Sequence, residues 1–95
     1  MSDVIAKAVE ALAAKMPSGF DGVVKFIIED EGSVIVDSDG VRASDDEAEV
    51  TLTADVDTFQ GVLSGDVNPT SAFMGGQLKV DGDMGAAMRL ASILV

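Results

Sequence analysis

Apolar side chains recur along the chain at two spacings, which divide it into strands and helices. Alternation of apolar and polar positions predicts strands over residues 20–29, 33–37, 41–43, 47–53 and 77–81. Spacing at three and four residues predicts helices over residues 2–16, 55–64, 69–74 and 83–95. Ser2 is a suitable N-cap for the first helix, and Gly65 and Pro69 suit the end of the second helix and the start of the third. The turn at residues 30–32 predicts that the first two strands form a hairpin.

The last helix is apolar over most of its circumference. One stripe of apolar side chains consists of Met84, Ala87, Met88, Ala91, Leu94 and Val95. Leu90 and Ile93 form a second apolar flank, and only Asp83, Arg89 and Ser92 are clearly polar. Such a helix must be covered on more than one side. The cover is either the sheet and the first helix together, or the sheet and a ligand, a membrane or a partner, and an uncovered face makes a homodimer reasonable.

Length and composition limit the chain to one domain. Ninety-five residues, 47% of them hydrophobic, provide a single hydrophobic core, so one domain over residues 1–95 is expected. No apolar run approaches the ~18 residues of a membrane span. Residues 1–4 show no positive region followed by an apolar stretch, so no secretory leader is expected. Without cysteine the redox compartment is not constrained, and a cytoplasmic location is expected.

The formal charge of −11, from 17 acidic and 6 basic residues, restricts the partners. Nucleic acid and anionic membranes are repelled by such a field. No nucleic-acid partner is therefore expected, and transient membrane contact is disfavoured at anionic surfaces. The acidic surface is explained either by solubility or by a salty habitat.

The residue types present argue against catalysis. The chain has no His and no Cys, which supply most proton transfer near neutral pH and most zinc sites. A calcium loop starting at Asp37 would need glycine where Arg42 stands. No glycine-rich phosphate motif occurs, and the serines have no histidine to activate them. We expect no enzyme activity, no metal and no cofactor.

The second half of the chain carries an ordered series of motifs. It contains Thr51-Leu52-Thr53, Phe59, Gly65, Asn68-Pro69, Ala72-Phe73-Met74, Gly76-Gln77-Leu78-Lys79-Val80 and Gly82-Asp83-Met84, followed by Ala87 and Leu90. No single piece is specific, but the series over residues 48–94 resembles the signature of sterol carrier protein domains. The first half fits that family only by its helix and hairpin order.

The resemblance implies a fold and a site. The fold would be α/β (α+β), with a five-stranded, mostly antiparallel sheet covered by helices and a hydrophobic tunnel between sheet and helices. The resemblance implies a tunnel framed by Phe59, Val62, Leu63, Phe73, Met74, Leu78, Val80, Met84, Ala87 and Met88. Gly76 and Gly82 would be needed for backbone conformation. One departure is Gln77, where the family often has lysine, and this removes a positive charge.

The resemblance also implies a function. It would be non-enzymatic binding and transfer of lipids such as fatty acyl chains, acyl-CoA, sterols or isoprenoid-like molecules. Apolar side chains fit this, since flexible methionines can line a cavity as well as fill gaps in a core. The alternative is an accessory or scaffold protein that presents a hydrophobic intermediate, such as a quinone precursor, to partner enzymes. Acyl-thioester hydrolysis is a third and weaker hypothesis, because no His or Cys is present.

Overall fold

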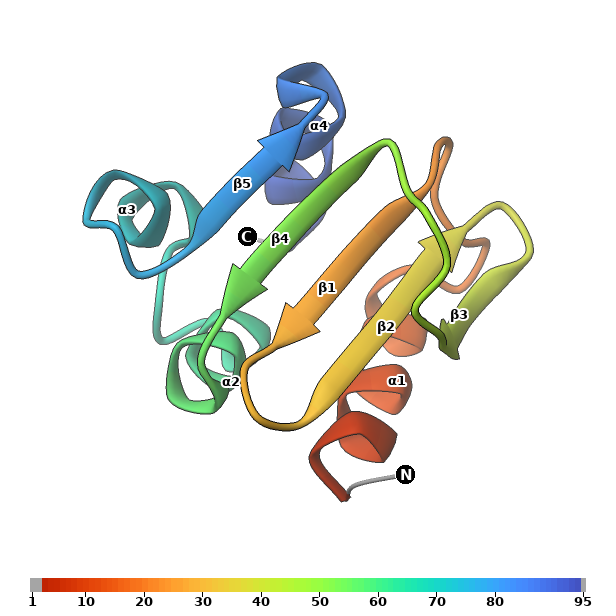
Figure 1. Ribbon diagram of the computed structural model, residues 1–95, viewed down its shortest axis with the longest axis horizontal. Helices are drawn as coiled ribbons and strands as arrows, with labels where there is room; N and C mark the ends of the chain where they lie inside the picture. Colours follow the sequence, from red (N-terminus) through yellow and green to blue (C-terminus); the bar gives the residue numbers. More distant parts are fainter. Residues whose placement is uncertain (1–2, 95) are drawn as a thin grey trace.

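Five strands form one mixed sheet, and the helices cover one of its faces. In the computed structural model, which describes residues 3–94, the strands are β1 (Val24–Ile28), β2 (Gly32–Asp37), β3 (Gly40–Ala43), β4 (Val50–Ala54) and β5 (Lys79–Gly82). The helices are α1 (Asp3–Lys15), α2 (Val56–Ser64), α3 (Pro69–Met74) and α4 (Met84–Leu94). The predicted N-cap Ser2 and the last stripe residue Val95 lie outside the described residues. Figure 1 shows α1, α2 and α4 behind the sheet.

The strand order is β3-β2-β1-β4-β5. The β1–β2, β2–β3 and β4–β5 pairs are antiparallel, whereas β1 and β4 run parallel, with Val24 opposite Val50. The predicted hairpin and the mostly antiparallel five-stranded sheet are therefore confirmed. The chain between β3 and β4 crosses the face opposite the helices (Figure 1).

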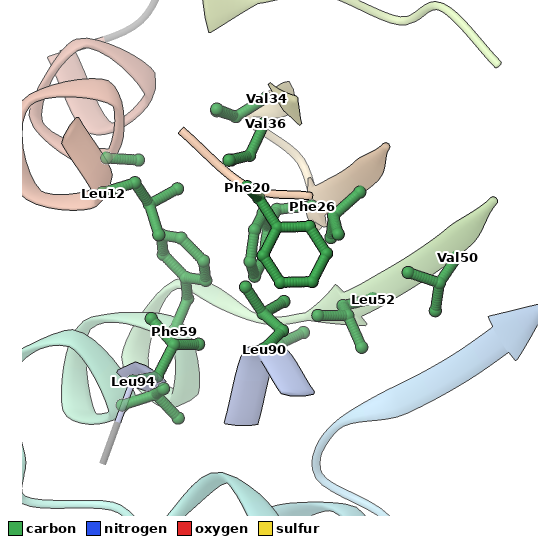
Figure 2. Close-up of a cluster of buried hydrophobic side chains, with 14 of the residues drawn as sticks. Leu12, Phe20, Phe26, Val34, Val36, Val50, Leu52, Phe59, Leu90 and Leu94 are labelled. Carbon is green, nitrogen blue, oxygen red and sulfur yellow. The ribbon is translucent and has the colours of Figure 1, made fainter. Parts of the chain in front are cut away.

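The core lies between the sheet and the helices. Alternate strand residues, among them Val24, Phe26 and Leu52, point towards the helices and are at most 5% exposed. Figure 2 shows Leu12 of α1 and Leu90 of α4 contributing to the same cluster. Burying such side chains contributes about 1.5–3 kcal/mol each relative to exposure. α1 packs against β2 and β3, and α4 packs against β4 and β5.

Three strands start later along the chain than predicted, whereas β2 and β3 each start one residue earlier and β4 and β5 each end one residue later. The first strand starts at Val24 rather than residue 20, because the Phe20 amide donates to the Asp37 carbonyl outside the ladder. The fifth starts at Lys79, because the amides of Gln77 and Leu78 both donate to the Ala72 carbonyl and close α3. β4 starts at Val50 rather than residue 47, since the preceding residues belong to the crossing segment.

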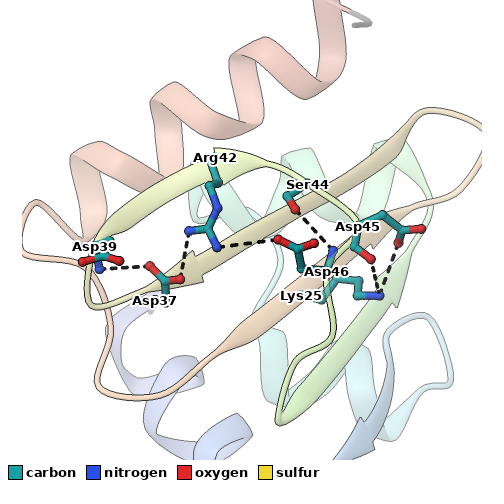
Figure 3. A network of polar contacts seen from close by, with 7 residues as sticks. All are labelled: Lys25, Asp37, Asp39, Arg42, Ser44, Asp45 and Asp46. Carbon is teal, nitrogen blue, oxygen red and sulfur yellow. Dashed lines mark hydrogen bonds and ion pairs between the residues drawn. The ribbon is translucent and has the colours of Figure 1, made fainter.

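Ion pairs lie on the face of the sheet away from the helices. Lys25 of β1 pairs with Asp45 at 3.2 Å, and Arg42 of β3 pairs with Asp37 at 2.8 Å, as Figure 3 shows. Ile35 lies between Lys25 and Arg42 in the register and is fully buried. Since its neighbours Val34 and Val36 point to the helices, Ile35 is covered on this outer face by the crossing segment and these charged side chains.

The Arg42 guanidinium holds the pKa of Asp37 below its usual value. Because the folded pKa lies below the unfolded one, the stabilisation is complete above about pH 4 and is lost as pH falls through the folded pKa. Replacing Arg42 with glutamine is expected to raise the Asp37 pKa towards its usual value, as followed by carboxyl-carbon NMR. Asp55 is the internal control, because its pKa is lowered by the backbone amide of Thr58 and should not move.

Candidate functional site

An apolar groove lies where α2, α3 and α4 meet the sheet. Its walls come from all three helices, and its floor comes from β1, β4 and β5. The groove is lined by Phe26, Leu52, Ala54, Phe59, Val62, Pro69, Thr70, Phe73, Leu78, Val80, Met84, Ala87, Met88, Leu90, Ala91 and Leu94. Together these side chains form what we call the apolar groove.

Aromatic contact fixes the floor of the groove. The rings of Phe26 on β1 and Phe59 on α2 meet edge to face, with centroids 5.5 Å apart and an interplanar angle of 65°. Such a contact adds about 0.5–1.5 kcal/mol to the burial of the two rings. Figure 2 shows Leu52 and Leu90 beside them. α2 is placed by its N-cap Asp55, which accepts from the Thr58 amide at 2.7 Å.

Local sequence also places α3. The Asn68 side chain accepts from the amides of Thr70 and Ser71, and Pro69 occupies the first turn, where its missing amide is not needed. Pro69 and Ala72 are buried, whereas Phe73 is 41% exposed and Met74 is 81% exposed. One side of α3 thus closes the groove, and the other side leaves large apolar side chains at the surface.

The buried face of α4 differs from the predicted stripe. Asp83 caps the helix rather than belonging to it, because its carboxylate accepts from the amides of Gly85 and Ala86. The buried residues are Ala86, Ala87, Leu90 and Leu94. Met84 and Met88, which belong to the predicted stripe, are 45% and 62% exposed. We call Phe73, Met74, Met84 and Met88 the groove rim.

The groove has little free space as it stands. Its cavity volume is about 60 Å³. The tunnel implied by the sequence resemblance stays a prediction, since the structure has a surface groove of this size. Methionine side chains at the rim are flexible and can be displaced at low energetic cost.

Chemically, the groove offers contact surface and little else. Thr70 is its one polar lining residue. Among residues 3–94, no three His, Cys, Asp or Glu side chains are arranged to hold a metal ion. The carboxyl groups with lowered pKa, namely Asp37, Asp45 and Asp55, lie outside the groove lining and owe their shifts to Arg42, Lys25 and the Thr58 amide. Within the same residues, no helix has the length and apolarity needed to cross a bilayer.

Most residues singled out from the sequence come together here. The groove lining includes Phe59, Val62, Phe73, Leu78, Val80, Met84, Ala87 and Met88. Leu63 instead lines a shallow depression between α1 and α2, and Met74 points outward from the end of α3 beyond the lining. Their contact with a ligand is a prediction that the geometry alone does not test.

Sequence reasoning missed part of the groove. The residues not singled out are Phe26, Leu52, Ala54, Pro69, Thr70, Leu90, Ala91 and Leu94. Alternation groups Phe26 with Val24 and Ile28 on one face of the first strand, and Leu52 with Val50 on one face of the fourth. This pattern is the signal that could have added Phe26 and Leu52 to the site. Nothing in the sequence pattern distinguishes Thr70.

Comparison with solved structures gives the class of fold. A solution structure of sterol carrier protein 2 from Aedes aegypti in complex with a C16 fatty acid, palmitate, aligns with a TM-score of 0.80 at 23% identity, covering 100% of this chain and 97% of that one. A crystal structure of sterol carrier protein 2 like 2 from the same species aligns with a TM-score of 0.78 at 19% identity, covering 94% of each. The fold is therefore that of the sterol carrier protein 2 structures.

Sequence comparison then gives the family. Residues 4–95 match the SCP-2 sterol transfer family, and the chain belongs to it. Bovine hydroxysteroid dehydrogenase-like protein 2 is 35% identical over 95 residues, which cover 99% of this chain and 22% of that protein. Human sterol carrier protein 2 is 42% identical over 50 residues, 53% of this chain and 9% of that protein. The chain thus spans about a fifth of the length, or less, of these curated relatives.

Proposed function

We propose that the chain binds a hydrophobic lipid in the apolar groove and transfers it without chemical change. The observation that carries this proposal is the groove itself, whose lining is apolar except for Thr70 and whose rim is open to the surface. Each buried methylene of a lipid chain contributes about 0.8 kcal/mol before ordering costs. Membership of the sterol transfer family and the palmitate complex of the Aedes aegypti protein support it.

Accommodating a long chain requires the groove to widen. A C16 chain, as bound by the Aedes aegypti protein, is far larger than the present cavity of about 60 Å³. The helix α3 is short and the rim is rich in methionine. Outward movement of the rim side chains and of α3 would enlarge the groove without breaking the central β1–β4 pairing.

A non-enzymatic role is part of the same proposal. The chain has no His or Cys, and none of the groove-lining residues carries a titratable side chain. A groove that presents only apolar contacts can hold a molecule but offers no group for proton transfer or nucleophilic attack. Turnover of an acyl thioester that is abolished by one carboxylate substitution would contradict this part.

The first test is native mass spectrometry of freshly purified protein, followed by organic extraction of any bound molecule. We expect a co-purifying acyl lipid or isoprenoid at substantial occupancy. A mass that stays unliganded after incubation with fatty acids, fatty alcohols and quinone analogues would mean that the groove is part of an ordinary core.

Partly filling the groove should weaken lipid binding. Replacing Met88 with tryptophan is expected to weaken lipid binding about four- to fifteen-fold, equivalent to one or two buried methylenes. Melting should change little, because Met88 is 62% exposed. Ile93→Trp is the matched control, since Ile93 lies on the same helix, is partly exposed and does not line the groove. Titration with a fluorescent lipid analogue that has an uncharged head group measures both variants, and equal affinities would contradict the assignment.

To deliver its lipid, the protein would place the groove rim against a membrane of low surface charge. Residues 68–95 carry Asp81, Asp83, Lys79 and Arg89, so the net charge of −11 lies in residues 1–67. All the large apolar side chains at the described surface, including the rim, belong to this neutral segment. We expect faster transfer to phosphatidylcholine vesicles than to vesicles containing phosphatidylserine, with a difference that shrinks as salt screens charge. Faster transfer to the anionic vesicles would contradict this orientation.

A second candidate function is presentation of a hydrophobic intermediate to partner enzymes in the cytoplasm. The match to hydroxysteroid dehydrogenase-like protein 2 covers 22% of that longer protein, so a domain of this family occurs there beside other segments. In this case the rim would contact a protein, or a second copy of the chain, rather than a bilayer. Vesicle transfer by the purified chain alone favours the carrier, and its absence together with a bound lipid favours presentation.

A further inference from the structure

The positions of the six basic side chains restrict the polar end of the bound molecule. A carboxylate or phosphate head group is normally held by Arg, Lys or backbone amides, and all six basic residues lie within the described part of the chain. None of them lines the apolar groove.

The two cations of residues 68–95, Arg89 and Lys79, point away from the groove. Arg89 stacks over the Phe20 ring at 5.7 Å and donates to the Asp21 carbonyl at 3.3 Å, in the loop before β1. Lys79 on β5 lies opposite Thr53 on β4 in the register and points to the opposite face of the sheet from Val80, which lines the groove. Neither cation is positioned to neutralise a negative head group at the rim.

The remaining cations belong to other parts of the surface. Lys25 and Arg42 form ion pairs with acidic residues on the outer face of the sheet. Lys7 lines the depression between α1 and α2, and Lys15 is in the last turn of α1. The charge next to the rim is negative, because Asp83 caps α4 immediately before Met84.

One group at the groove can pair with an uncharged polar end. Thr70 is exposed and lines the groove, and its hydroxyl makes no hydrogen bond to any described residue. A hydroxyl can both donate and accept, so it can pair with an alcohol, an ester or a ketone. It cannot compensate a full negative charge in a protein whose net charge is already −11.

We infer that the ligand is an amphiphile with an uncharged hydrogen-bonding head, such as a hydroxyl, ester or carbonyl group, rather than a carboxylate or a coenzyme A thioester. The inference rests on the proposed lipid binding in the groove. It narrows the ligand class, because it excludes acyl-CoA and disfavours free fatty acids.

The test compares ligands with the same hydrocarbon chain and different heads. Monopalmitoylglycerol, palmitate and palmitoyl-CoA compete with the neutral fluorophore N-phenylnaphthylamine for the full chain at neutral pH. The chain has no Trp or Tyr, so protein fluorescence does not interfere. We expect monopalmitoylglycerol to bind at least roughly tenfold more tightly than palmitate, and palmitoyl-CoA to bind most weakly. The gaps should shrink between about 0.01 M and about 0.1 M salt, as the Debye length falls from ~30 Å to ~10 Å.

A pair of variants isolates the charge. M88K places a cation at the rim, and M88Q shortens the apolar surface without adding charge. For each variant, the quantity compared is the affinity for palmitate divided by the affinity for monopalmitoylglycerol. This ratio is expected to be severalfold higher in M88K than in M88Q. Equal or tighter binding of palmitate or palmitoyl-CoA by the unmodified chain overturns the inference but leaves the groove as a lipid site. Displacement of the fluorophore by none of the three overturns the proposed function itself, and the inference with it.

Discussion

Replacing Leu90 with alanine is expected to lower the free energy of unfolding by about 2–5 kcal/mol. Leu90 is fully buried in α4 and belongs both to the core cluster and to the groove lining. Its removal leaves a cavity between α4 and the sheet, and the neighbouring side chains can close only part of it. Urea denaturation followed by far-ultraviolet circular dichroism measures the loss.

Ile93→Ala is the matched control for this change. Ile93 lies on the same helix but is 39% exposed and is absent from the core cluster. Its truncation should cost about 1 kcal/mol or less, as most surface substitutions do. Equal losses in the two variants would contradict the rotation of α4, in which Leu90 rather than Ile93 faces the sheet.

Gly82→Ala is expected to destabilise the fold by about 2–6 kcal/mol, from positive-φ strain and steric overlap together. Gly82 ends β5 with φ +110°, and an added Cβ would collide with the Glu49 carbonyl oxygen. That oxygen cannot easily withdraw, because it also accepts from the Asp83 amide at 3.0 Å. The collision would push β5 away from β4 and disturb one side of the groove.

Gly40→Ala separates the two contributions to this loss. Gly40 has a similar φ of +123°, but an added Cβ there would meet no atom within 4 Å. It should therefore show only the backbone cost, about 1–3 kcal/mol. Thermal unfolding of both variants gives the comparison. A Gly82→Ala loss no larger than that of Gly40→Ala would show that β5 adapts to the extra atom without strain.

Much of the fold could be predicted from the sequence, because the side chains that alternate as apolar along the strands are the ones buried in the core. Alternation placed Val24, Phe26 and Ile28 on one face, and all three are buried. Strand ends were harder to predict, since they depend on where amides find partners. The Leu78 amide bonds to the Ala72 carbonyl and not to β4, which no local pattern reveals.

The burial of Ile35 on the outer face of the sheet could not be predicted from the sequence either. Ile35 alternates with Val34 and Val36 and should therefore face solvent, yet it is fully buried. Its cover depends on the path of the segment between β3 and β4 and on the ion pairs that Lys25 and Arg42 form. Side chains distant in sequence create this environment, so periodicity alone cannot predict it.

The groove lining overlaps the predicted site residues of the second half of the chain. The family resemblance pointed to residues of the second half, and Phe59, Phe73 and Met88 do line the groove. Phe26 was missed because it lies in the first half, which resembled the family only by element order. The predicted stripe on the last helix did not distinguish Met88, which is 62% exposed, from Ala87 and Leu94, which are buried.

The parallel pairing of β1 with β4 has a consequence for how the chain folds. β1, β2 and β3 can form a meander from neighbouring residues, but β4 must arrive from beyond the crossing segment, and such distant pairings form slowly. Until then, the edge of β1 and the apolar side chains beside it remain open to other chains. The acidic charge concentrated in residues 1–67 makes incomplete molecules repel one another. The acidic charge of the folded surface would therefore also slow aggregation of partly folded molecules in which β4 has not yet paired with β1.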